Sequence, residues 1–318
     1  MPACDVSVIG LYILDVLGRP VQAIPAGGNV EFIDEIRLTV AGTAGGTAVD
    51  CAKLGLRTLA VGAVGADEKA DFVIATLQKF GADTSLMQRL PGVPTSATIL
   101  NVRPNGDRPA LHQRGASDHF ELTEAQVAQA VAAPFVHVGG TGLLAKLDGA
   151  PTVALMQAAK AAGRTTTYDL IAANSGTLAL VRPVLPFVDW FIPSIEEAQA
   201  ICGLTAPRDV AKFFRDLGAR WVVLTMGGDG CLVAGEGVTL RLPAHDVAVS
   251  DTTGCGDAFS AGLIAGLHHG WDVEKAARFA GAAGALVATG LGSDAGIVDF
   301  AGTVHAMNTL PQRPIAEP

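Results

Sequence analysis

The chain has 318 residues, of which 49% are hydrophobic and 17% are charged, so it can bury a full core, about three quarters of its unfolded surface. Its formal net charge of -9 argues against nonspecific binding to nucleic acid or to an anionic membrane, because both need a basic surface. Abundant glycine, with 38 residues, and an aromatic content of only 5% favour an α/β enzyme with close helix-on-sheet packing over an aromatic-rich β-sandwich.

The start of the chain and its cysteines indicate the compartment. Residues 4–10 read as a core strand with no signal-peptide pattern before them, so we expect a cytoplasmic protein. No apolar run approaches the roughly 18 residues of a membrane helix, which predicts that the chain does not enter a membrane. The five cysteines are scattered and form no Cys-x-x-Cys pair, so we expect free thiols, with neither disulfides nor a zinc site.

Short apolar segments followed by helical patterns recur along the chain. Strand and helix pairs are predicted at residues 58–64 with 68–80, 135–138 with 151–162, and 187–192 with 196–201. This alternation predicts an α/β fold in one domain, residues 1–318, with a doubly wound, mostly parallel sheet covered by helices. Strands at 221–225 and 231–234, joined by Gly-Gly-Asp-Gly, predict an antiparallel hairpin near the sheet edge.

Two stretches depart from this alternation. Residues 19–40 mix glycine and proline with short strand patterns, and residues 96–112 read as a hairpin around Pro104-Asn105-Gly106. We predict that segments near 12–41 and 95–113 form a small β-lid over the mouth where such a sheet binds its ligands. The alternative is a pair of surface hairpins.

The most informative segment is Asp251-Thr-Thr-Gly-Cys-Gly-Asp-Ala-Phe259, which opens an Ala-rich helix. Gly254 and Gly256 allow a sharp turn, so the first amides of the helix converge on one point and, with the helix dipole, stabilise a phosphoryl group. Asp257 would repel a phosphate, but it suits accepting a proton from an attacking hydroxyl. The alternative is an Asp that merely complements the helix dipole.

This segment resembles the C-terminal signature of the ribokinase-like (PfkB) carbohydrate kinase family. Residues 44–55, Ala-Gly-Gly-Thr-Ala-Val-Asp-Cys-Ala-Lys-Leu-Gly, and their continuation to Asp67 resemble its N-terminal signature, so the likeness extends over nearly the whole chain. The resemblance implies a ribokinase-like fold, an ATP-dependent kinase activity, Asp257 as the base, and amides of Gly254, Cys255 and Gly256 as an anion hole. The family usually has a small residue at position 255. Because the amide and not the side chain would act there, we expect little effect of Cys255 on function, while a thiol at a helix N-terminus can be acidified and open to alkylation.

The resemblance also implies substrate contacts. Gly45 and Gly46 would present backbone amides to substrate hydroxyls, and Asp15 matches a sugar-binding Asp of the family. Asp50 stands where the family usually has Asn, which puts the substrate identity in doubt. The alternatives are that the two glycines only form a tight turn and that Asp50 is a solvated helix residue.

For the nucleotide, the resemblance implies three regions. Thr225, Gly227 and Gly230 match a turn that lies along the ATP phosphates, although a simple hairpin turn has the same pattern. Ser194 and Glu197 fall on the family's Asn-x-x-Glu, associated with Mg2+ through water, with Ser in place of Asn. Residues 281–296, beginning at Gly281, match the segment that covers adenine.

A monovalent cation, K+, is implied by the same family. The positions that match its ligands are Asp251, Thr253, Val287, Gly290 and Gly292, the family often having Arg at position 290. From the residues alone, Arg114 is nominated as the basic residue beside the substrate, to pair with a carboxylate or phosphate. The alternative is a surface Arg beside a loop.

Together these patterns predict ATP- and Mg2+-dependent phosphorylation of a hydroxymethyl or hydroxyl group of a small sugar or sugar derivative. A homodimer through the lid is expected from the family, and a shared lid sheet would also protect exposed strand edges. Three alternatives stay open: a nucleoside kinase of the same family, a catalytically weak sugar-binding protein, and an NAD-dependent oxidoreductase. The last lacks a Gly-x-Gly-x-x-Gly after the first strand.

Overall fold

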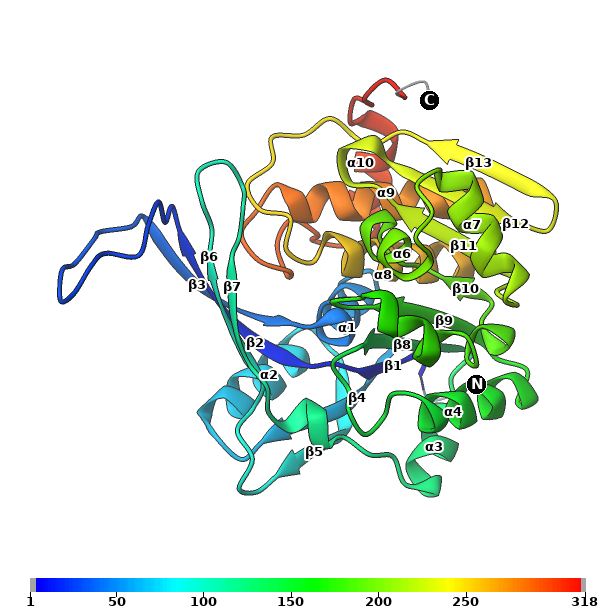
Figure 1. Ribbon diagram of the computed structural model, residues 1–318, viewed down its shortest axis with the longest axis horizontal. Coiled ribbons are helices and arrows are strands. Elements are labelled where there is room, and N and C mark those ends of the chain that lie inside the picture. The colour runs from blue at the N-terminus through cyan, green and yellow to red at the C-terminus, as the bar shows by residue number, and fades with distance from the viewer. Residues whose placement is uncertain (1–3, 316–318) are drawn as a thin grey trace.

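The computed structural model of the chain describes residues 4–315. Within them the strands form a central nine-stranded sheet and a separate four-stranded sheet (Figure 1). The strands of the central sheet are β1 (Val6–Gly10), β4 (Thr58–Gly65), β5 (Asp83–Leu90), β8 (Phe135–Thr141), β9 (Thr165–Leu170), β10 (Trp190–Phe191), β11 (Trp221–Thr225), β12 (Cys231–Gly235) and β13 (Val238–Leu242).

The order of the central sheet is β13-β12-β11-β10-β9-β8-β1-β4-β5. The strands from β11 to β5 are paired in parallel, whereas β12 and β13 add an antiparallel edge. The chain runs outward from β1 through β4 to β5, and then returns to β8 on the other side of β1. Sheets of this kind bind ligands beyond the carboxyl ends of the strands where the chain reverses in this way.

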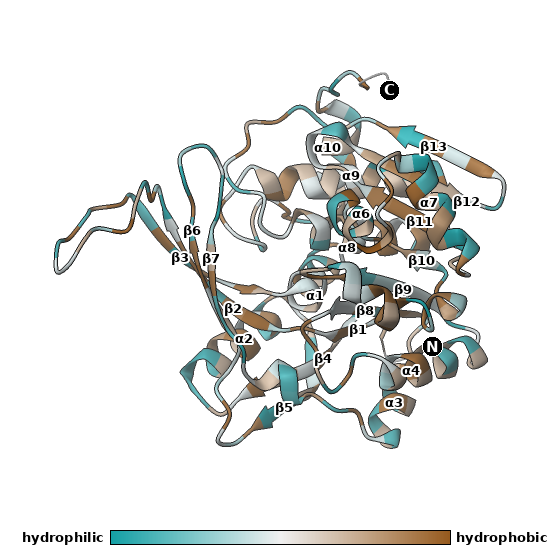
Figure 2. Cartoon of the chain, in the orientation of Figure 1, coloured by the Kyte–Doolittle hydropathy of each residue, from teal (hydrophilic) through white to brown (hydrophobic). Residues whose placement is uncertain are grey.

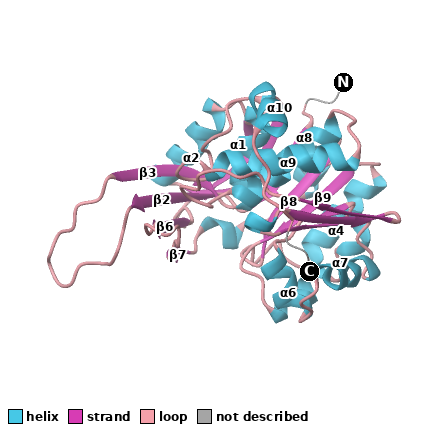
Figure 3. Ribbon diagram, turned by 90° about the horizontal axis from the view of Figure 1, so that it is seen from above, coloured by secondary structure: helices cyan, strands magenta, loops and turns pink. Residues whose placement is uncertain are grey.

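Helices cover both faces of the central sheet (Figure 3). One face carries α1 (Thr43–Lys53), α2 (Glu68–Lys79), α8 (Cys255–His268), α9 (Val273–Ala288) and α10 (Phe300–Thr309). The other carries α3 (Glu124–Ala130), α4 (Ala150–Ala161), α5 (Leu178–Val181), α6 (Ile195–Cys202) and α7 (Pro207–Asp216).

The central strands are apolar at nearly every position because helices cover both faces of the sheet. Val8 of β1 packs against the face that carries α1 and α8, and its neighbour Ile9 packs against the opposite face. Because successive side chains alternate between two covered faces, a strand here is apolar at nearly every position. Figure 2 shows the result as brown, hydrophobic colouring on β11 and β12.

The α/β fold with a mostly parallel, helix-covered sheet is confirmed, and so is the antiparallel hairpin of β11 and β12. Residues 187–192 were predicted as one strand, but β10 covers only Trp190–Phe191, because a short 3-10 turn through Pro186 precedes it. No helix within residues 4–315 is both long and apolar enough to span a bilayer. The cysteines, all of which lie in that range, are free thiols.

The four-stranded sheet has the order β3-β2-β6-β7. Its strands are β2 (Ile13–Arg19), β3 (Glu35–Ala41), β6 (Ala97–Asn101) and β7 (Ala110–Gln113). They come from the two segments expected near 12–41 and 95–113, which therefore lie in one sheet and are not separate surface hairpins. Figure 1 shows this sheet projecting from the main body beside α1 and α2. We refer to it as the lid sheet.

Candidate active site

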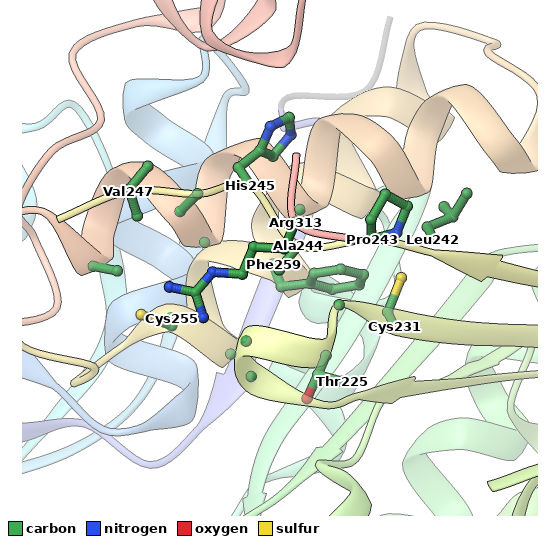
Figure 4. A pocket seen from close by; sticks show the side chains of 18 of the residues that line it. Thr225, Cys231, Leu242, Pro243, Ala244, His245, Val247, Cys255, Phe259 and Arg313 are labelled. Atoms are coloured by element: carbon green, nitrogen blue, oxygen red, sulfur yellow. The ribbon is translucent and has the colours of Figure 1, made fainter. Parts of the chain in front are cut away.

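Two adjacent cavities open beyond the carboxyl ends of the central strands. The larger, of about 700 Å3, lies among α8, α9, the turn after β11 and residues 242–249 (Figure 4). The smaller, of about 580 Å3, lies between the lid sheet, the end of β9 and the start of α8. The residues that line both cavities are Arg108, Ser194, Glu196, Thr225, Thr252 and Gly256. A ligand in one cavity therefore meets a ligand in the other at the N-terminus of α8.

The N-terminus of α8 is shaped by Gly254. This residue is the N-cap and has a φ of 81°, in the left-handed region that favours glycine. A Cβ on Gly254 would also collide with Ser293. The first amides of a helix have no intrahelical acceptor, and the helix dipole places partial positive charge there. This turn, which we call the anion cradle, lies at the junction of the two cavities in a position suited to an anion, and within it Cys255 N donates to the carbonyl of Thr252 at 3.4 Å.

Asp257 stands in the first turn of α8 and lines the smaller cavity. Its side chain is almost wholly buried, and burial raises its pKa from 3.8 to about 7. The negative charges of Asp15 and Glu197 raise the pKa further, whereas the positive charge of Arg108 lowers it. A carboxyl group with a pKa near neutrality can take a proton from a hydroxyl in the cavity and later release it.

Gly46 lies against this carboxylate. It is part of α1, which packs beside α8, and a Cβ on Gly46 would overlap the Asp257 carboxylate. The hydrogen bonds differ from those expected. The amide of Gly45 donates to the carbonyl of Leu11 at 3.1 Å and that of Gly46 to the carbonyl of Gly42 at 2.8 Å. Neither amide is therefore presented to a substrate, because α1 already begins at Thr43.

Asp15 enters the smaller cavity from the lid sheet. It lies on β2, with Thr98 of β6 as its register partner, and both residues line the cavity. Burial raises the pKa of Asp15 to about 7, while the Thr98 hydroxyl lowers it. Oδ1 of Asp15 is buried and has no hydrogen-bond partner within the described residues. A buried acceptor of this kind is suited to a ligand hydroxyl.

Asp169 is a cavity residue that the sequence analysis missed. It lies near the end of β9, where Leu170 N donates to Oδ1 at 2.8 Å and Ser260 Oγ of α8 lies 3.5 Å from Oδ2. Burial raises its pKa well above the usual range, and the charges of Glu197 and Asp257 add to this effect. The signal in the sequence was a lone acidic residue at the end of the β-branched run Thr-Thr-Thr-Tyr-Asp-Leu.

The basic residue beside the cavities is Arg108, not Arg114. Arg108 lies in the loop between β6 and β7, lines both cavities, and donates from Nε to Thr252 Oγ1 at 3.2 Å. Arg114 lies outside both linings and pairs with Asp118 at 3.3 Å. His112 of β7 also lines the smaller cavity, and its Nδ1 lies 3.0 Å from Thr98 Oγ1.

Asp50 also differs from its expected place. It lies one turn beyond Gly46 on α1, fully buried, and is not part of the lining of either cavity. Burial raises its pKa well above the usual range, opposed by the charge of Lys53. It is therefore neither a solvated helix residue nor a substrate contact in this structure. The residues of this turn that do line the smaller cavity are Gly42 and Thr43.

Ser194 and Glu197 form a capping box at the start of α6. The Ser194 hydroxyl accepts from Glu197 N at 3.2 Å, and Glu197 Oε2 accepts from Ser194 N at 3.2 Å and from its hydroxyl at 3.1 Å. Burial raises the pKa of Glu197. The serine in place of Asn thus fixes the carboxylate on the wall of the smaller cavity.

The residues predicted for the nucleotide line the larger cavity. Thr225 ends β11, and Gly227 and Gly230 belong to the turn that follows it. Gly281 lies on α9 beside Gly284, so a flat wall of small residues faces the cavity. Cys255 lines this cavity too, but burial raises its thiol pKa to about 12, so the expected acidification is wrong. Desolvation outweighs the helix dipole here.

The residues predicted to hold a monovalent cation lie beside the anion cradle. Asp251 Oδ1 accepts from the amide and the hydroxyl of Thr253, at 3.0 and 2.8 Å, and Oδ2 accepts from Gly292 N at 2.9 Å. Gly290 N donates to the carbonyl of Val287 at 3.1 Å. A Cβ on Gly290 would collide with Ala295, which explains why a larger residue is not accommodated at this position.

Comparisons with known proteins show similarity to sugar kinases. A solved Arabidopsis thaliana ribokinase, complexed with ribose and ATP, covers 96% of this chain and 99% of its own at 19% identity, with a TM-score of 0.81. A 2-dehydro-3-deoxygluconokinase of Bacillus subtilis is 26% identical over 270 residues, which are 81% of this chain and 83% of the relative. Fructokinase-1 of Oryza sativa is 27% identical over 269 residues, 79% of this chain and 83% of the relative.

The family model extends this agreement along most of the chain. The model for pfkB family carbohydrate kinases matches residues 4–299, which include both cavities except for the C-terminal residues Gln312 and Arg313. The relatives named above are sugar kinases, which transfer a phosphoryl group to an alcohol. This chain belongs to the pfkB family of carbohydrate kinases.

Proposed function

We propose that this carbohydrate kinase transfers the γ-phosphoryl group of ATP to a hydroxyl or hydroxymethyl group of a small, uncharged sugar or sugar derivative. The observation that carries the proposal is the position of Asp257, a buried carboxyl with a pKa near 7 at the point where two cavities meet on the anion cradle of α8. ATP occupies the larger cavity and the sugar the smaller one.

Each of the residues at this site then has a separate role in the phosphoryl transfer. Asp15 orients the sugar, and Asp257 accepts the proton of its attacking hydroxyl. The amides at the start of α8, from Gly254 to Gly256, stabilise the charge on the transferring group. Thr225 and the turn after it hold the phosphates, and Arg108 lies across the opening between the two cavities.

The donor atoms fit Mg2+ held mainly by the nucleotide. Among the described residues no cluster of three or more His, Cys, Asp and Glu side chains could hold a metal ion. Mg2+ typically keeps several waters and binds one or two carboxylates together with substrate phosphates, and Glu197 supplies a carboxylate on the cavity wall. When bound, the ion neutralises phosphate charge. We also propose K+ beside Asp251, Thr253 and the carbonyls of residues 287–292.

The lining of the smaller cavity supports an uncharged acceptor. Its acidic residues, Asp15, Asp169, Glu196, Glu197 and Asp257, offer no positive charge to a sugar acid or a phosphosugar, and Arg108 is the arginine among its lining residues. The lining is less suited to a nucleoside. In the described part of the chain, no Phe, Tyr or Trp that could stack on a base lines this cavity.

An acceptor panel tests the proposal. We expect ADP release from Mg-ATP with at least one uncharged pentose or hexose, and at least 10-fold lower turnover with sugar acids, phosphosugars and nucleosides. Repeating the assay in K+, Na+ and choline buffers tests the cation, and equal rates would remove K+. Binding of a sugar without ADP release would favour the sugar-binding alternative, and turnover confined to charged acceptors would contradict the substrate class.

The outer face of the lid sheet supports a homodimer through the lid. Ile36 of β3 is 71% exposed and Leu111 of β7 is 64% exposed, and Ile99 of β6 lies between them on the same face. Figure 2 shows further hydrophobic stretches on the loop beyond β2 and β3, where Phe32 is 93% exposed. An exposed apolar patch of this kind marks an interaction surface.

We therefore expect the protein to elute as a dimer in size-exclusion chromatography with light scattering. Replacing Ile36 and Leu111 together with Lys should shift it to the monomer, because each dimer would then bury four unpaired charges. The matched control replaces Val238 and Val298, which are exposed apolar residues outside the lid sheet, with Lys. A wild-type monomer, or a dimer that survives the lid changes, would contradict this assignment.

A further inference from the structure

The C-terminal segment is fastened to the rim of the larger cavity. It crosses residues 244–246, where Arg313 N donates to the carbonyl of Ala244 at 2.9 Å and Asp246 N donates to the carbonyl of Pro311 at 2.8 Å. An antiparallel bridge also joins His245 to Gln312. The segment is thereby held in position, and both Gln312 and Arg313 become part of the cavity lining. Figure 4 shows Arg313 at this cavity.

Arg313 directs its guanidinium over the turn that follows β11. Its Nη1 lies 2.6 Å from the place where a Cβ on Gly228 would be, so the glycine leaves room for the arginine. Its Nε donates to Asp246 Oδ1 at 3.2 Å, and this is the ion pair that the side chain forms within residues 4–315. Asp246 thus orients the guanidinium while the terminal nitrogens face the turn.

The charge of this site fits an anion. The turn after β11 and the start of α8 both line the larger cavity, and a guanidinium over the turn adds a full positive charge with several donors. Arginine binds phosphate oxygens in a bidentate fork that lysine lacks. The segment lies beyond residue 299, where the family match ends.

We propose that Arg313 binds the phosphate chain of the nucleotide in the larger cavity. This assignment rests on the proposed function, because it takes ATP as the occupant. Arg313 is a binding residue that sets nucleotide affinity, and it takes no part in the proton transfer at Asp257. Its contribution should depend on the number of phosphates in the ligand and be absent for adenosine.

The test is titration calorimetry of the full chain with ATP, ADP and adenosine. For Arg313→Gln we expect about 10-fold weaker binding of ATP and ADP, the usual effect of losing one charge-assisted hydrogen bond, and unchanged binding of adenosine. Arg313→Lys should recover only part of the loss. In turnover assays the KM for ATP should rise by a similar factor, with kcat and the KM for the sugar unchanged.

Arg89→Gln is the matched control. Arg89 is 44% exposed and pairs with Asp71, as Arg313 is 41% exposed and pairs with Asp246, but it lies outside both cavities. Equal ATP affinity in wild type and Arg313→Gln would overturn the assignment while leaving the kinase intact. An equal loss for adenosine would show that the guanidinium contacts the base and would also overturn it. A wild-type protein that binds no ATP would overturn the proposed function and this assignment together.

Discussion

Replacing Asp257 with Asn is expected to lower turnover about 100-fold to 10,000-fold, the usual contribution of a general base. Asn keeps the size of the side chain but cannot accept the proton of the attacking hydroxyl. Because the amide still fits beside Gly46, the affinities for ATP and for the sugar should change little. The measurement is ADP release at saturating substrates, with calorimetry to confirm that both ligands still bind.

A stability measurement separates a lost base from a damaged fold. The pKa of Asp257 is about 7 in the folded protein and 3.8 ordinarily, so the folded state holds a proton that the unfolded state releases between these values. The wild type therefore loses stability as pH rises through this window, and above pH 7 it contains a buried charge. Asn removes that charge, so the variant should melt at a higher temperature than the wild type at pH 8, with a smaller difference at pH 5.

The same pKa predicts how the turnover of the wild type depends on pH in the acid range. Turnover should fall as pH decreases below about 7, because a protonated Asp257 cannot act as a base. Asp15 also has a pKa near 7, and its charge raises the pKa of Asp257. The fall in turnover at low pH therefore reports the titration of the two carboxyl groups together. Wild-type-like turnover in Asp257→Asn, or activity that is level down to pH 5, would overturn the assignment of the base.

The features that the sequence predicted well are local in the chain. The turn into α8 depends on consecutive residues from Asp251 to Asp257, and the hairpin of β11 and β12 depends on one Gly-Gly-Asp-Gly turn. In both cases the backbone conformation follows from neighbouring residues, so the pattern and the structure agree. The alternation of strand and helix patterns likewise predicts the layers of the fold, because each amphipathic segment must bury one face.

The features that it missed depend on the register of distant segments. Asp169 is recognisable only when β9 is placed beside α8, and Arg108 only when the lid sheet is paired with the main body. Asp50 was assigned to the substrate because the start of α1 could not be fixed by pattern alone. With α1 beginning at Thr43, a displacement of one helical turn moves a side chain from the cavity into the core.

The position of α1 against α8 places Gly46 beside the Asp257 carboxylate. Gly46→Ala is the second change with a large expected effect. The new methyl group would overlap the Asp257 carboxylate, which is almost wholly buried except where it lines the smaller cavity. The carboxylate must therefore turn or shift from the position in which it faces the attacking hydroxyl. A displacement of about 1 Å at a reacting group can lower turnover about 100-fold, so we expect a loss of about 10-fold to 100-fold in kcat.

Two further variants show whether Gly46 acts through Asp257. Gly45→Ala is the matched control on the same helix, because its Cβ would meet Val40 Cγ1 at 3.1 Å and Tyr12 Cδ1 at 3.5 Å but not Asp257, and it should keep most of the activity. If the methyl group acts by displacing the base, the double variant Gly46→Ala with Asp257→Asn should be no slower than Asp257→Asn alone. If the double variant instead loses activity by the product of the two single losses, the methyl group acts on a group other than Asp257. Unchanged kcat with a lower melting temperature would show that α1 moves instead, and that the close approach of α1 and α8 serves packing and not the position of the base.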